Sequence, residues 1–516
     1  MTSPTYVLGV DIGTTSTKAV LFTETGDIVA KAAVGYPLNR PTPEAAEQDP
    51  VEICAAVKAS VGDVMAQSDL APSQVRCLSF SAAMHSLILV DAANEPLTAS
   101  ITWADNRSAD WVSKIRQNHH GHDLYRRTGT PIHPMSPLVK LVWLRHDHAD
   151  LFQRAERFIS IKEYVLFQLC QEYVVDYSIA GATGLFNIKT LDWDADALEL
   201  AGVSPQKLSR LVPTTHVMPP LQPACAAEMG LARETPVVVG ASDGCLANLG
   251  VGAIAPGTVA ITLGTSGAIR TVAPQPQTDP SEILFCYPLT DQHWVIGGAV
   301  NNGGIVFQWV RDRLAATEVA TAELLQQDAY ELLTDMAATI PPGADGILFH
   351  PYLAGERSPL WNADARGSFF GLALHHTKAH LVRAVLEGVV FNLRLVLEAL
   401  EEAAGKAETI RASGGFAQSE LWRQILADIC DRPITVPESY EASCFGAALL
   451  GLCALGDIPS LEEAAKRVQA SHEQTPVAEN VVCYQPLIPI YGRLLDCFKR
   501  EYGPLARLSP HLKDNL

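Results

Sequence analysis

Long hydrophobic runs, paired cysteines and excess positive charge are all absent from this 516-residue chain. No apolar run reaches about 18 residues, so the sequence predicts no membrane-spanning helix. The first residues lead directly into strand-like sequence without a basic and then an apolar region, which argues against a signal peptide. The eleven cysteines include no Cys-x-x-Cys pair and no spacing typical of a zinc site. We therefore expect reduced thiols and a cytoplasmic chain.

Positive charge is scarce: 38 Lys and Arg face 57 Asp and Glu, which gives a formal net charge of −19. Nucleic acids and anionic membranes are bound through basic faces that neutralise phosphates, so we expect neither as a partner. An anionic small-molecule substrate would need a local cluster of Arg, Lys or His.

Several common site motifs are also missing. The chain has no Gly-x-x-x-x-Gly-Lys-Ser/Thr loop, and Ala268 prevents a Gly-x-Ser-x-Gly elbow around Ser266. Gly250-Val-Gly superficially resembles a dinucleotide fingerprint, but Pro256-Gly257 follows where its helix would begin. These observations argue against a P-loop enzyme and a dinucleotide-binding protein.

One motif is present in two variants. Leu8–Lys18 and Ile261–Ile269 each read as an apolar strand, a turn of Gly and hydroxyl residues, and a second strand. We expect the turn glycines, Gly13 and Gly264, to take backbone angles that other residues avoid. The turn N–H groups and hydroxyls would then form a concavity suited to phosphate oxygens. One such turn is equally well an ordinary hairpin, but two of them half a chain apart suggest a duplicated fold that holds a phosphate chain between its halves.

The length predicts two to four domains at roughly 150 residues each, and 48% hydrophobic with 18% charged residues is ordinary for an α/β protein. Asp49-Pro50 is typical of a helix start, and we place a domain boundary near 245–257. Strands are expected at 6–12, 18–24, 28–33, within 75–90, and at 236–240, 258–263, 268–273 and 294–299. Helices are expected at 303–316, 376–404, 419–430 and 442–455.

Two carboxylates follow apolar strands. Asp11 precedes the first turn and could hold Mg²⁺ beside a phosphate, or simply close the turn with a hydrogen bond. Asp243, in Gly240-Ala-Ser-Asp-Gly244, is our candidate for a catalytic base, because ligands of open α/β sheets bind at the carboxyl ends of the strands. The flanking glycines would let a substrate approach the backbone. The alternative is that Asp243 caps the following helix.

The segment Trp103-Ala-Asp105-Asn-Arg107 combines an aromatic ring, an acid and a base at every second position. If this segment is extended, the three side chains share one face and suit a polyhydroxylated ligand; a surface salt bridge is the alternative. His85 follows a strand and could bond a sugar hydroxyl, or be a core histidine. The glycines at 303–304 and 414–415 precede helices, where free N–H groups could bind an anion, although Gly-Gly is also common in turns.

Together these residues resemble the FGGY family of carbohydrate kinases, within the actin-like ATPase superfamily, from Leu8 to about Gly451. The most specific likenesses are the two hairpin turns, the Asp243 loop and the segment from Gly367 to Gly388; Met135–Trp143 and Gly355–Pro359 also match. The resemblance implies an α/β fold of two ribonuclease H-like (actin-like ATPase) lobes with a central cleft. It implies an N-terminal lobe over 1–247 for the sugar and the base, a C-terminal lobe over 256–455 for the nucleotide, and a helical tail over 456–516.

The resemblance also implies residue roles. Asp243 matches the catalytic base and Asp11 the carboxylate of the Mg²⁺–phosphate site. The sugar pocket maps to Met84, His85, Trp103, Asp105, Arg107 and Asp243. The phosphate and nucleotide contacts map to Gly13, Thr14, Thr15, Lys18, Gly264, Thr265, Ser266, Gly304, Gln308, Gly414, Gly415 and Ser419.

The implied activity is transfer of phosphate from ATP, with Mg²⁺, to a primary hydroxyl of a small-molecule sugar or sugar acid. Three segments, at 83–88, 101–105 and 129–137, are similar to the gluconate-phosphorylating branch, for which Arg107 and His133 are our candidates for binding the carboxylate. A xylulokinase or other pentulose or polyol kinase, and a non-kinase actin-like ATPase, are the alternatives. A sugar-responsive regulator would need a basic helix-turn-helix extension, which the sequence lacks. A homodimer is compatible with the resemblance.

Overall fold

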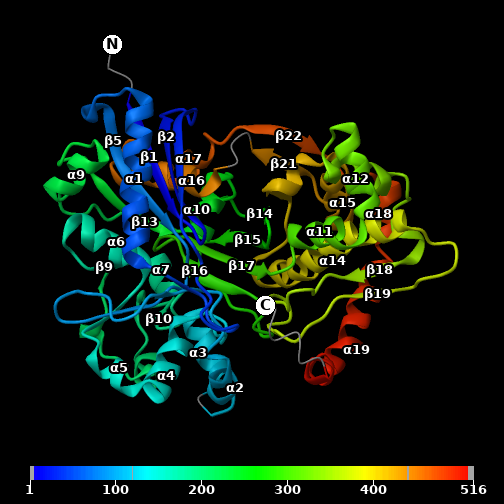
Figure 1. Cartoon of the computed structure of the whole chain (residues 1–516), viewed down its shortest axis with the longest axis horizontal. Coiled ribbons are helices and arrows are strands. Elements are labelled where there is room, and N and C mark those ends of the chain that lie inside the picture. The colour runs from blue at the N-terminus through cyan, green and yellow to red at the C-terminus, as the bar shows by residue number, and fades with distance from the viewer. Residues whose placement is uncertain (1–4, 119, 438–440, 509–516) are drawn as a thin grey trace. The chain divides into compact units, whose positions relative to one another are not determined.

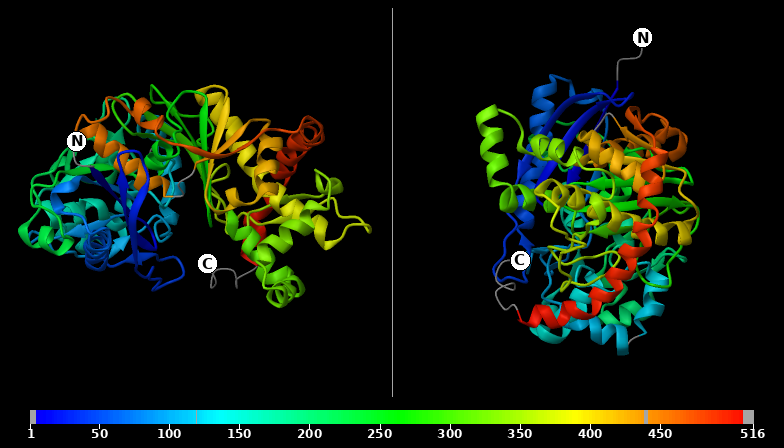
Figure 2. Two further views of the ribbon diagram at one scale, coloured as in Figure 1. Left: turned by 90° about the horizontal axis from the view of Figure 1, so that it is seen from above. Right: turned by 90° about the vertical axis from the view of Figure 1, so that its right-hand side faces the viewer.

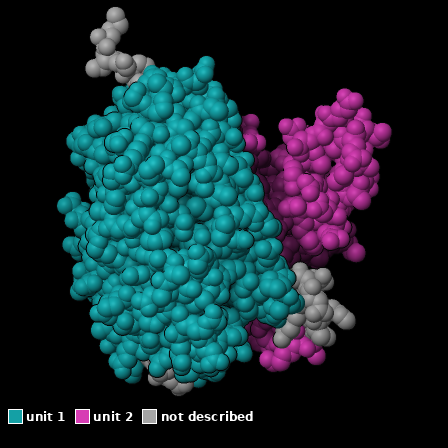
Figure 3. Space-filling model, turned by 60° about the vertical axis from the view of Figure 1, so that its left-hand side comes forward, with its two compact units in different colours: residues 1–255, 272–296, 441–468 teal, residues 256–271, 297–440, 469–516 magenta. Residues whose placement is uncertain are grey.

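The computed structural model describes residues 5–118, 120–437 and 441–508, which fall into two compact units (Figure 3). Unit 1 comprises Met1–Ala255, Val272–Ile296 and Glu441–Val468, and unit 2 comprises Pro256–Thr271, Gly297–Tyr440 and Gln469–Leu516. The units are thus discontinuous in sequence, whereas the lobes expected from the resemblance are contiguous.

The central sheet of unit 1 has the order β13-β5-β1-β2-β3 (Figure 1). Strands β1, β2 and β3 form an antiparallel meander, while β5 and β13 run parallel to β1. The register pairs Ile12 with Ala82 and Ala82 with Ser242. The carboxyl ends of β1, β5 and β13 therefore lie level at one edge of the sheet. These strands are β1 (Tyr6–Ile12), β2 (Ser16–Thr23), β3 (Ile28–Gly35), β5 (Val75–Ala82) and β13 (Val237–Ser242).

Both faces of this sheet are covered by helices. Because strand side chains alternate between faces, Leu8, Val10 and Ile12 lie together in the core cluster that also contains the buried side of α1 (Pro50–Ser68). The opposite face carries α16 (Ala442–Ala454), which approaches β1 so closely that a Cβ on Gly9 would collide with the carbonyl of Cys444. The expected start of α1 is confirmed: Asp49 accepts a hydrogen bond from the Val51 N–H (2.8 Å), and Pro50 opens the helix.

The remaining elements of unit 1 surround this sheet, and several of them, among them α4 and α8, contribute to a second core cluster. They are β4 (Glu47–Gln48), β6 (Ile88–Val90), β7 (Ser100–Ile101), α2 (Ala109–Asn118), α3 (Gly121–Thr128), α4 (Pro137–Asp147), α5 (Ala149–Arg154), β8 (Arg157–Ile159), α6 (Ile161–Cys170), β9 (Val174–Asp176), α7 (Tyr177–Gly181), β10 (Phe186–Asn187), β11 (Asp192–Trp193), α8 (Ala195–Ala201), β12 (Arg210–Val212), α9 (Pro223–Met229), α10 (Asp243–Gly250), β16 (Phe285–Pro288) and α17 (Leu461–Ala465).

Unit 2 repeats the strand order of unit 1. Its strands belong to a seven-stranded sheet of order β16-β17-β15-β14-β20-β21-β22, in which β21-β20-β14-β15-β17 corresponds to β13-β5-β1-β2-β3. Strands β14 and β15 are antiparallel, whereas β20 is parallel to β14 and β21 is parallel to β20. The expected α/β fold, with two units of one type, is confirmed. These strands are β14 (Thr258–Leu263), β15 (Gly267–Ala273), β17 (Trp294–Val300), β20 (Thr409–Ser413), β21 (Ile434–Pro437) and β22 (Ala470–Gln474).

Helices complete unit 2, and the longest are α14 and α19, of which α19 is drawn in red in Figure 2. The segment expected as one helix over 303–316 is shorter: α11 passes into a π-helical turn at Val310–Leu314. The other elements are α11 (Gly304–Trp309), α12 (Ala316–Leu325), α13 (Ala329–Ala338), β18 (Leu348–His350), β19 (Ser368–Phe370), α14 (Lys378–Ala404), α15 (Glu420–Cys430), α18 (Ala478–Tyr484) and α19 (Leu487–Leu508).

The two hairpin turns form where expected, but the reason given for their glycines is wrong. Neither Gly13 nor Gly264 adopts a positive φ. The Gly13 N–H donates to the Ser16 carbonyl (3.1 Å), and a Cβ at Gly13 would lie only 3.0 Å from that oxygen. Space, rather than backbone angle, favours glycine in the first turn.

The structure also bears on membrane-spanning helices and on the cysteines. Within the ranges described above, no helix combines the length and the apolar character needed to cross a bilayer. All eleven cysteines lie in these ranges as free thiols, and most of them are buried.

The close approach of α16 to β1 predicts a stability effect. Gly9→Ala places a methyl group against the Cys444 backbone, and overpacking of this kind costs about 1–3 kcal/mol. We expect a lower melting temperature in thermal unfolding. The matched control is Gly35→Ala on β3, whose new Cβ would meet only the Thr15 carbonyl oxygen at 3.7 Å. Equal melting temperatures for the two variants would show that α16 can move away from β1 without loss of stability, contrary to this prediction.

Candidate active site

Asp243 lies at the carboxyl end of β13, half-buried, as the first residue of α10. The N-cap of that helix is Ser242, whose hydroxyl accepts a hydrogen bond from the Cys245 N–H (3.4 Å). The alternative that Asp243 is the capping residue is therefore wrong. Its carboxylate instead accepts a hydrogen bond from the adjacent Gly244 N–H (2.7 Å). The carboxylate thus lies at the sheet edge, beside the first turn of α10.

The strand that carries Asp243 is anchored by buried polar groups. Lys162 on α6 forms an ion pair with Asp176 (2.8 Å) and donates to the Ala241 carbonyl (3.1 Å). The Ser178 hydroxyl bonds both the hydroxyl (2.6 Å) and the N–H (2.9 Å) of Ser242. These contacts fix the two residues that precede the candidate base.

Gly240 has a different role from the one expected. Its φ is +70°, and a Cβ there would collide with the carbonyl of Phe80 on β5. The register of β13 against β5 shifts at this point. Glycine is required by the approach of two strands, not by the approach of a substrate.

Asp11 lies at the end of β1, level with Ser81 on β5. Its carboxylate accepts a hydrogen bond from the Ser81 hydroxyl (2.6 Å). Burial raises the pKa of Asp11, whereas the Ser81 hydrogen bond and the nearby Lys18 ammonium oppose this shift. Lys18, opposite Asp11 in the hairpin, forms an ion pair with Glu441 (3.2 Å).

A magnesium ion is compatible with this arrangement. Mg²⁺ is commonly bound by one or two carboxylates, with water and substrate phosphates completing its shell. In the part of the chain that the structure describes, no three His, Cys, Asp or Glu side chains form a complete metal site. Asp11 offers one carboxylate of the kind that Mg²⁺ uses.

The predicted sugar and phosphate residues of unit 1 are in direct contact. The Trp103 indole N–H donates to the Thr14 hydroxyl (3.0 Å), and the Gln48 side-chain amide donates to the Thr14 carbonyl (2.6 Å). The first phosphate turn and the aromatic candidate thus form one surface.

The expectation that Trp103, Asp105 and Arg107 share one face is wrong, because the segment is a turn. Asp105 is fully buried, and its oxygens accept hydrogen bonds from the Ala46 N–H (2.9 Å) and from the backbone and guanidinium of Arg107. Arg107 also forms an ion pair with Glu47 (2.6 Å). Asp105 therefore holds the Arg107 guanidinium in place, and this guanidinium is shared by the carboxylates of Asp105 and Glu47.

Met84 and His85 follow β5. His85 is buried with a φ of +67°, and its Nδ1 lies 2.7 Å from the Ala182 carbonyl. Because a carbonyl only accepts, Nδ1 carries the proton. His133 uses its Nδ1 to accept a hydrogen bond from the Met135 N–H (3.2 Å).

Unit 2 contains a separate cavity of about 1010 Å³. It is bounded by the second hairpin turn and by helices α11, α13 and α15. Six predicted nucleotide residues line it, whereas Ser266 and Gly414 do not. The six are Gly264, Thr265, Gly304, Gln308, Gly415 and Ser419.

Sequence reasoning missed the aromatic and helical walls of this cavity. Phe307, Phe416 and Trp422 pack edge to face, with ring centroids 5.7 Å apart for Phe307–Trp422 and 5.9 Å for Phe416–Trp422. Helix α13 contributes Tyr330 and Glu331. No motif marks these residues, but the aromatic side chains that follow the Gly-Gly segments, Phe307 after 303–304 and Phe416 and Trp422 after 414–415, could have indicated them.

The glycines of unit 2 act through close packing. The Gly304 N–H donates to the Gly264 carbonyl (2.7 Å), and a Cβ at Gly304 would lie 2.8 Å from that oxygen. Gly414 has a φ of +100° and passes against the Leu263 carbonyl. The expectation of a free N–H group is therefore wrong for Gly304. Ser419 is the N-cap of α15, where its hydroxyl accepts a hydrogen bond from the Trp422 N–H (3.3 Å).

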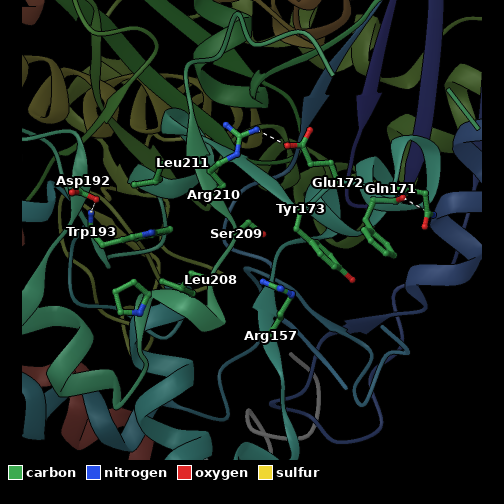
Figure 4. Close-up of a pocket in the computed structure, with 12 residues that line it drawn as sticks. Arg157, Gln171, Glu172, Tyr173, Asp192, Trp193, Leu208, Ser209, Arg210 and Leu211 are labelled. Carbon is green, nitrogen blue, oxygen red and sulfur yellow. Dashed lines mark hydrogen bonds and ion pairs between the residues drawn. The ribbon is translucent and has the colours of Figure 1, made fainter. Parts of the chain in front are cut away.

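A further open pocket of about 670 Å³ lies elsewhere in unit 1 and contains none of the predicted site residues. Figure 4 shows its Arg210–Glu172 ion pair (2.6 Å). The Arg157 guanidinium lies 5.2 Å from the centroid of the Tyr173 ring. Neither Asp11 nor Asp243 lines this pocket.

Comparison with known proteins identifies the relatives of this chain. The models for the N- and C-terminal domains of the FGGY family of carbohydrate kinases match residues 6–250 and 259–455. The chain is 51% identical over 502 residues to the gluconokinase of Bacillus subtilis, covering 97% of this chain and 98% of that protein. It is 28% identical to the xylulose kinase of the same species, over 95% of this chain and 96% of that protein. The solved gluconate kinase structure from Lactobacillus acidophilus is similar with a TM-score of 0.92 at 38% identity, covering 98% of this chain and all of that one.

The geometry around Arg107 predicts that its removal destabilises unit 1. Arg107→Leu would leave the buried Asp105 carboxylate without its cation, and breaking such a pair typically costs about 3 kcal/mol. We expect a clear fall in melting temperature. Arg210→Leu, which breaks an exposed pair with Glu172, is the matched control and should change stability by less than about 1 kcal/mol. An unchanged melting temperature for Arg107→Leu would contradict this assignment.

Proposed function

The chain belongs to the FGGY family of carbohydrate kinases, and from that premise we propose that it transfers the γ-phosphoryl group of ATP to the primary hydroxyl of D-gluconate. The product is 6-phospho-D-gluconate. The identity of 51% to a gluconokinase over nearly the whole chain supports gluconate as the acceptor. The 28% identity to a xylulose kinase gives xylulose less support.

One observation carries the mechanism. The register of β1, β5 and β13 brings Asp11, the Met84–His85 segment and Asp243 to one edge of a single sheet. An acceptor bound there has a carboxylate base on one side and a phosphate turn on the other. The Trp103–Thr14 hydrogen bond ties a sugar candidate to the phosphate turn.

Asp243 accepts the proton of the primary hydroxyl as that oxygen attacks the γ-phosphorus. The new O–P bond forms while the bond to the ADP oxygen breaks, and the proton passes from Asp243 to solvent. General base catalysis of this kind contributes about 10²–10⁴ in rate. Most of the remaining acceleration comes from positioning and charge neutralisation, since phosphoryl transfer needs little covalent chemistry from the protein.

The cavity of unit 2 is proposed to take the adenosine. Its aromatic walls at Phe307, Phe416 and Trp422 suit a flat apolar base, and Gln308 and Glu331 offer polar groups along its lining. Gly264 and Thr265 would meet the phosphates at the end of this cavity. Gly415, beside which nothing lies within 4 Å of an added Cβ, leaves room for the ligand.

Asp11 is the residue that would hold Mg²⁺. When bound, the ion would neutralise phosphate charge. Burial raises the pKa of Asp11 against the opposing effects of Ser81 and Lys18, and a divalent ion would favour the charged carboxylate further. Thr14 and Thr15 form the adjacent turn, and Lys18 lies opposite Asp11 on β2.

The carboxylate of gluconate requires its own recognition. Because Glu47 and Asp105 already share Arg107, we favour His133 over Arg107 among the two candidates. Met84, His85 and Trp103 remain the candidates for the hydroxyl groups. A homodimer also remains a prediction, which light scattering would test.

A substrate panel tests the proposal. ADP release, measured in a coupled assay with ATP and Mg²⁺, should be fastest with gluconate among gluconate, xylulose, ribulose and glycerol. We expect kcat/KM for gluconate to exceed that for each neutral compound by at least tenfold. Activity that is independent of any sugar would favour a non-kinase ATPase instead, and a preference for xylulose would favour the pentulose kinases.

The base assignment has its own test. Asp243→Asn keeps the shape of the side chain but removes the base, so kcat should fall by at least about 10² while ATP still binds by calorimetry. Asp150→Asn, on the exposed first turn of α5, is the control and should retain full activity. A fall in kcat of less than tenfold would refute the role of Asp243.

A further inference from the structure

A buried lysine with an unusual set of partners lies beside the sugar site. Lys140, on α4, is fully buried. Its ammonium donates to three backbone carbonyls, those of His85 (2.7 Å), Thr102 (2.7 Å) and Ile101 (3.3 Å). It forms no ion pair with any described residue.

The three carbonyls belong to the two segments that carry the sugar candidates. His85 follows Met84 at the end of β5, and Thr102 immediately precedes Trp103. These segments are distant along the chain, and they pair directly through reciprocal hydrogen bonds between Leu87 and Ile101 (3.0 and 2.9 Å). One ammonium group therefore spans both.

The contact to His85 is of particular importance because His85 has a φ of +67°. A non-glycine residue persists in this region only where its surroundings hold it there, and such residues concentrate at functional sites. The Lys140 ammonium holds the carbonyl of His85, and the Ala182 carbonyl holds its ring. Both ends of the residue are thus restrained.

An ammonium in this position is costly for stability. Burial lowers the pKa of Lys140 to about 7, an effect that the charge of Asp105 opposes and that of Arg107 reinforces. Apolar side chains of similar length would fill the same volume without this cost. Its presence in a well-packed helix, whose neighbours Val139 and Leu141 are fully buried, points to a function other than filling space.

We propose that Lys140 is a positioning residue for the sugar: it holds the His85 backbone and the Thr102–Trp103 turn at the spacing that the acceptor requires. This inference rests on the proposed function, because it concerns the same acceptor site. Lys140 touches neither substrate nor phosphate and acts through the two segments that it joins.

The test is Lys140→Met, which keeps the length of the side chain but removes all three donors. We expect KM for gluconate to rise at least tenfold, with KM for ATP within twofold of the unmodified protein. Lys207→Met is the matched control, since Lys207 also donates to a backbone carbonyl, that of Ala155, outside the sugar segments. The control should leave both KM values within twofold.

Two results would overturn the proposal: an unchanged KM for gluconate, or equal increases in KM for gluconate and ATP. A second measurement decides the matter if Lys140→Met does not fold. In the unmodified protein, the amine loses one of its three N–H donors as the pH rises through about 7. KM for gluconate should therefore rise at least threefold from pH 6 to pH 8.5 while KM for ATP stays constant, and a flat profile for gluconate refutes the role.

The outcomes separate this inference from the proposed function. If the unmodified protein does not phosphorylate gluconate, the proposed function fails. The Lys140 comparison is then made with the sugar that the protein does phosphorylate, and the same selective increase in KM is expected there.

Discussion

The parallel pairing of β1, β5 and β13 is the constraint on which the rest of the structure depends. Their register aligns Ile12, Ala82 and Ser242, so residues from three distant parts of the chain leave the sheet at one edge. Peptide groups at the ends of these strands have no further ladder partners, and loops that begin there are free to carry side chains for a ligand. Unit 2 repeats the pattern with β14 and β20, whose ends bring the second hairpin turn beside Gly414 and Gly415.

Buried charges hold the loops of unit 1 in place. Lys162 with Asp176 anchors the strand before Asp243, Asp105 anchors Arg107, and Lys140 joins the segments of His85 and Trp103. In a low-dielectric interior each of these groups is costly unless its bonds are all made, and the bonds are made in one arrangement only. Such groups are poor sources of stability, but they select one loop geometry over its neighbours.

The two units use one fold for different chemistry. The site of unit 1 is built from carboxylates, hydroxyls and a tryptophan whose indole N–H bonds a phosphate-turn hydroxyl. The cavity of unit 2 is walled by aromatic rings and closed at one end by a glycine turn. The division follows from side chains, since the strand order β13-β5-β1-β2-β3 recurs as β21-β20-β14-β15-β17. The proposed roles therefore rest on the residues at the strand ends and not on the fold.

Local sequence was sufficient for the five strands of the unit 1 sheet, for β14, β15 and β17, for the two hairpins and for the Asp49-Pro50 helix start, because alternation, capping and turn chemistry act over a few residues. It did not predict β20, β21 and β22 or the short strands β8–β12. The family followed from the resemblance of whole motifs. Local sequence was not sufficient for the partners of buried groups. Only the tertiary structure determines that buried Asp105 accepts a hydrogen bond from the Ala46 N–H and that Arg107 forms an ion pair with Glu47. It also determines that α13 and the second hairpin turn line one cavity, and it places Glu441–Val468 in unit 1. Each of these outcomes depends on contacts between segments far apart in the chain, and no local pattern records which distant group will satisfy a buried charge or carbonyl.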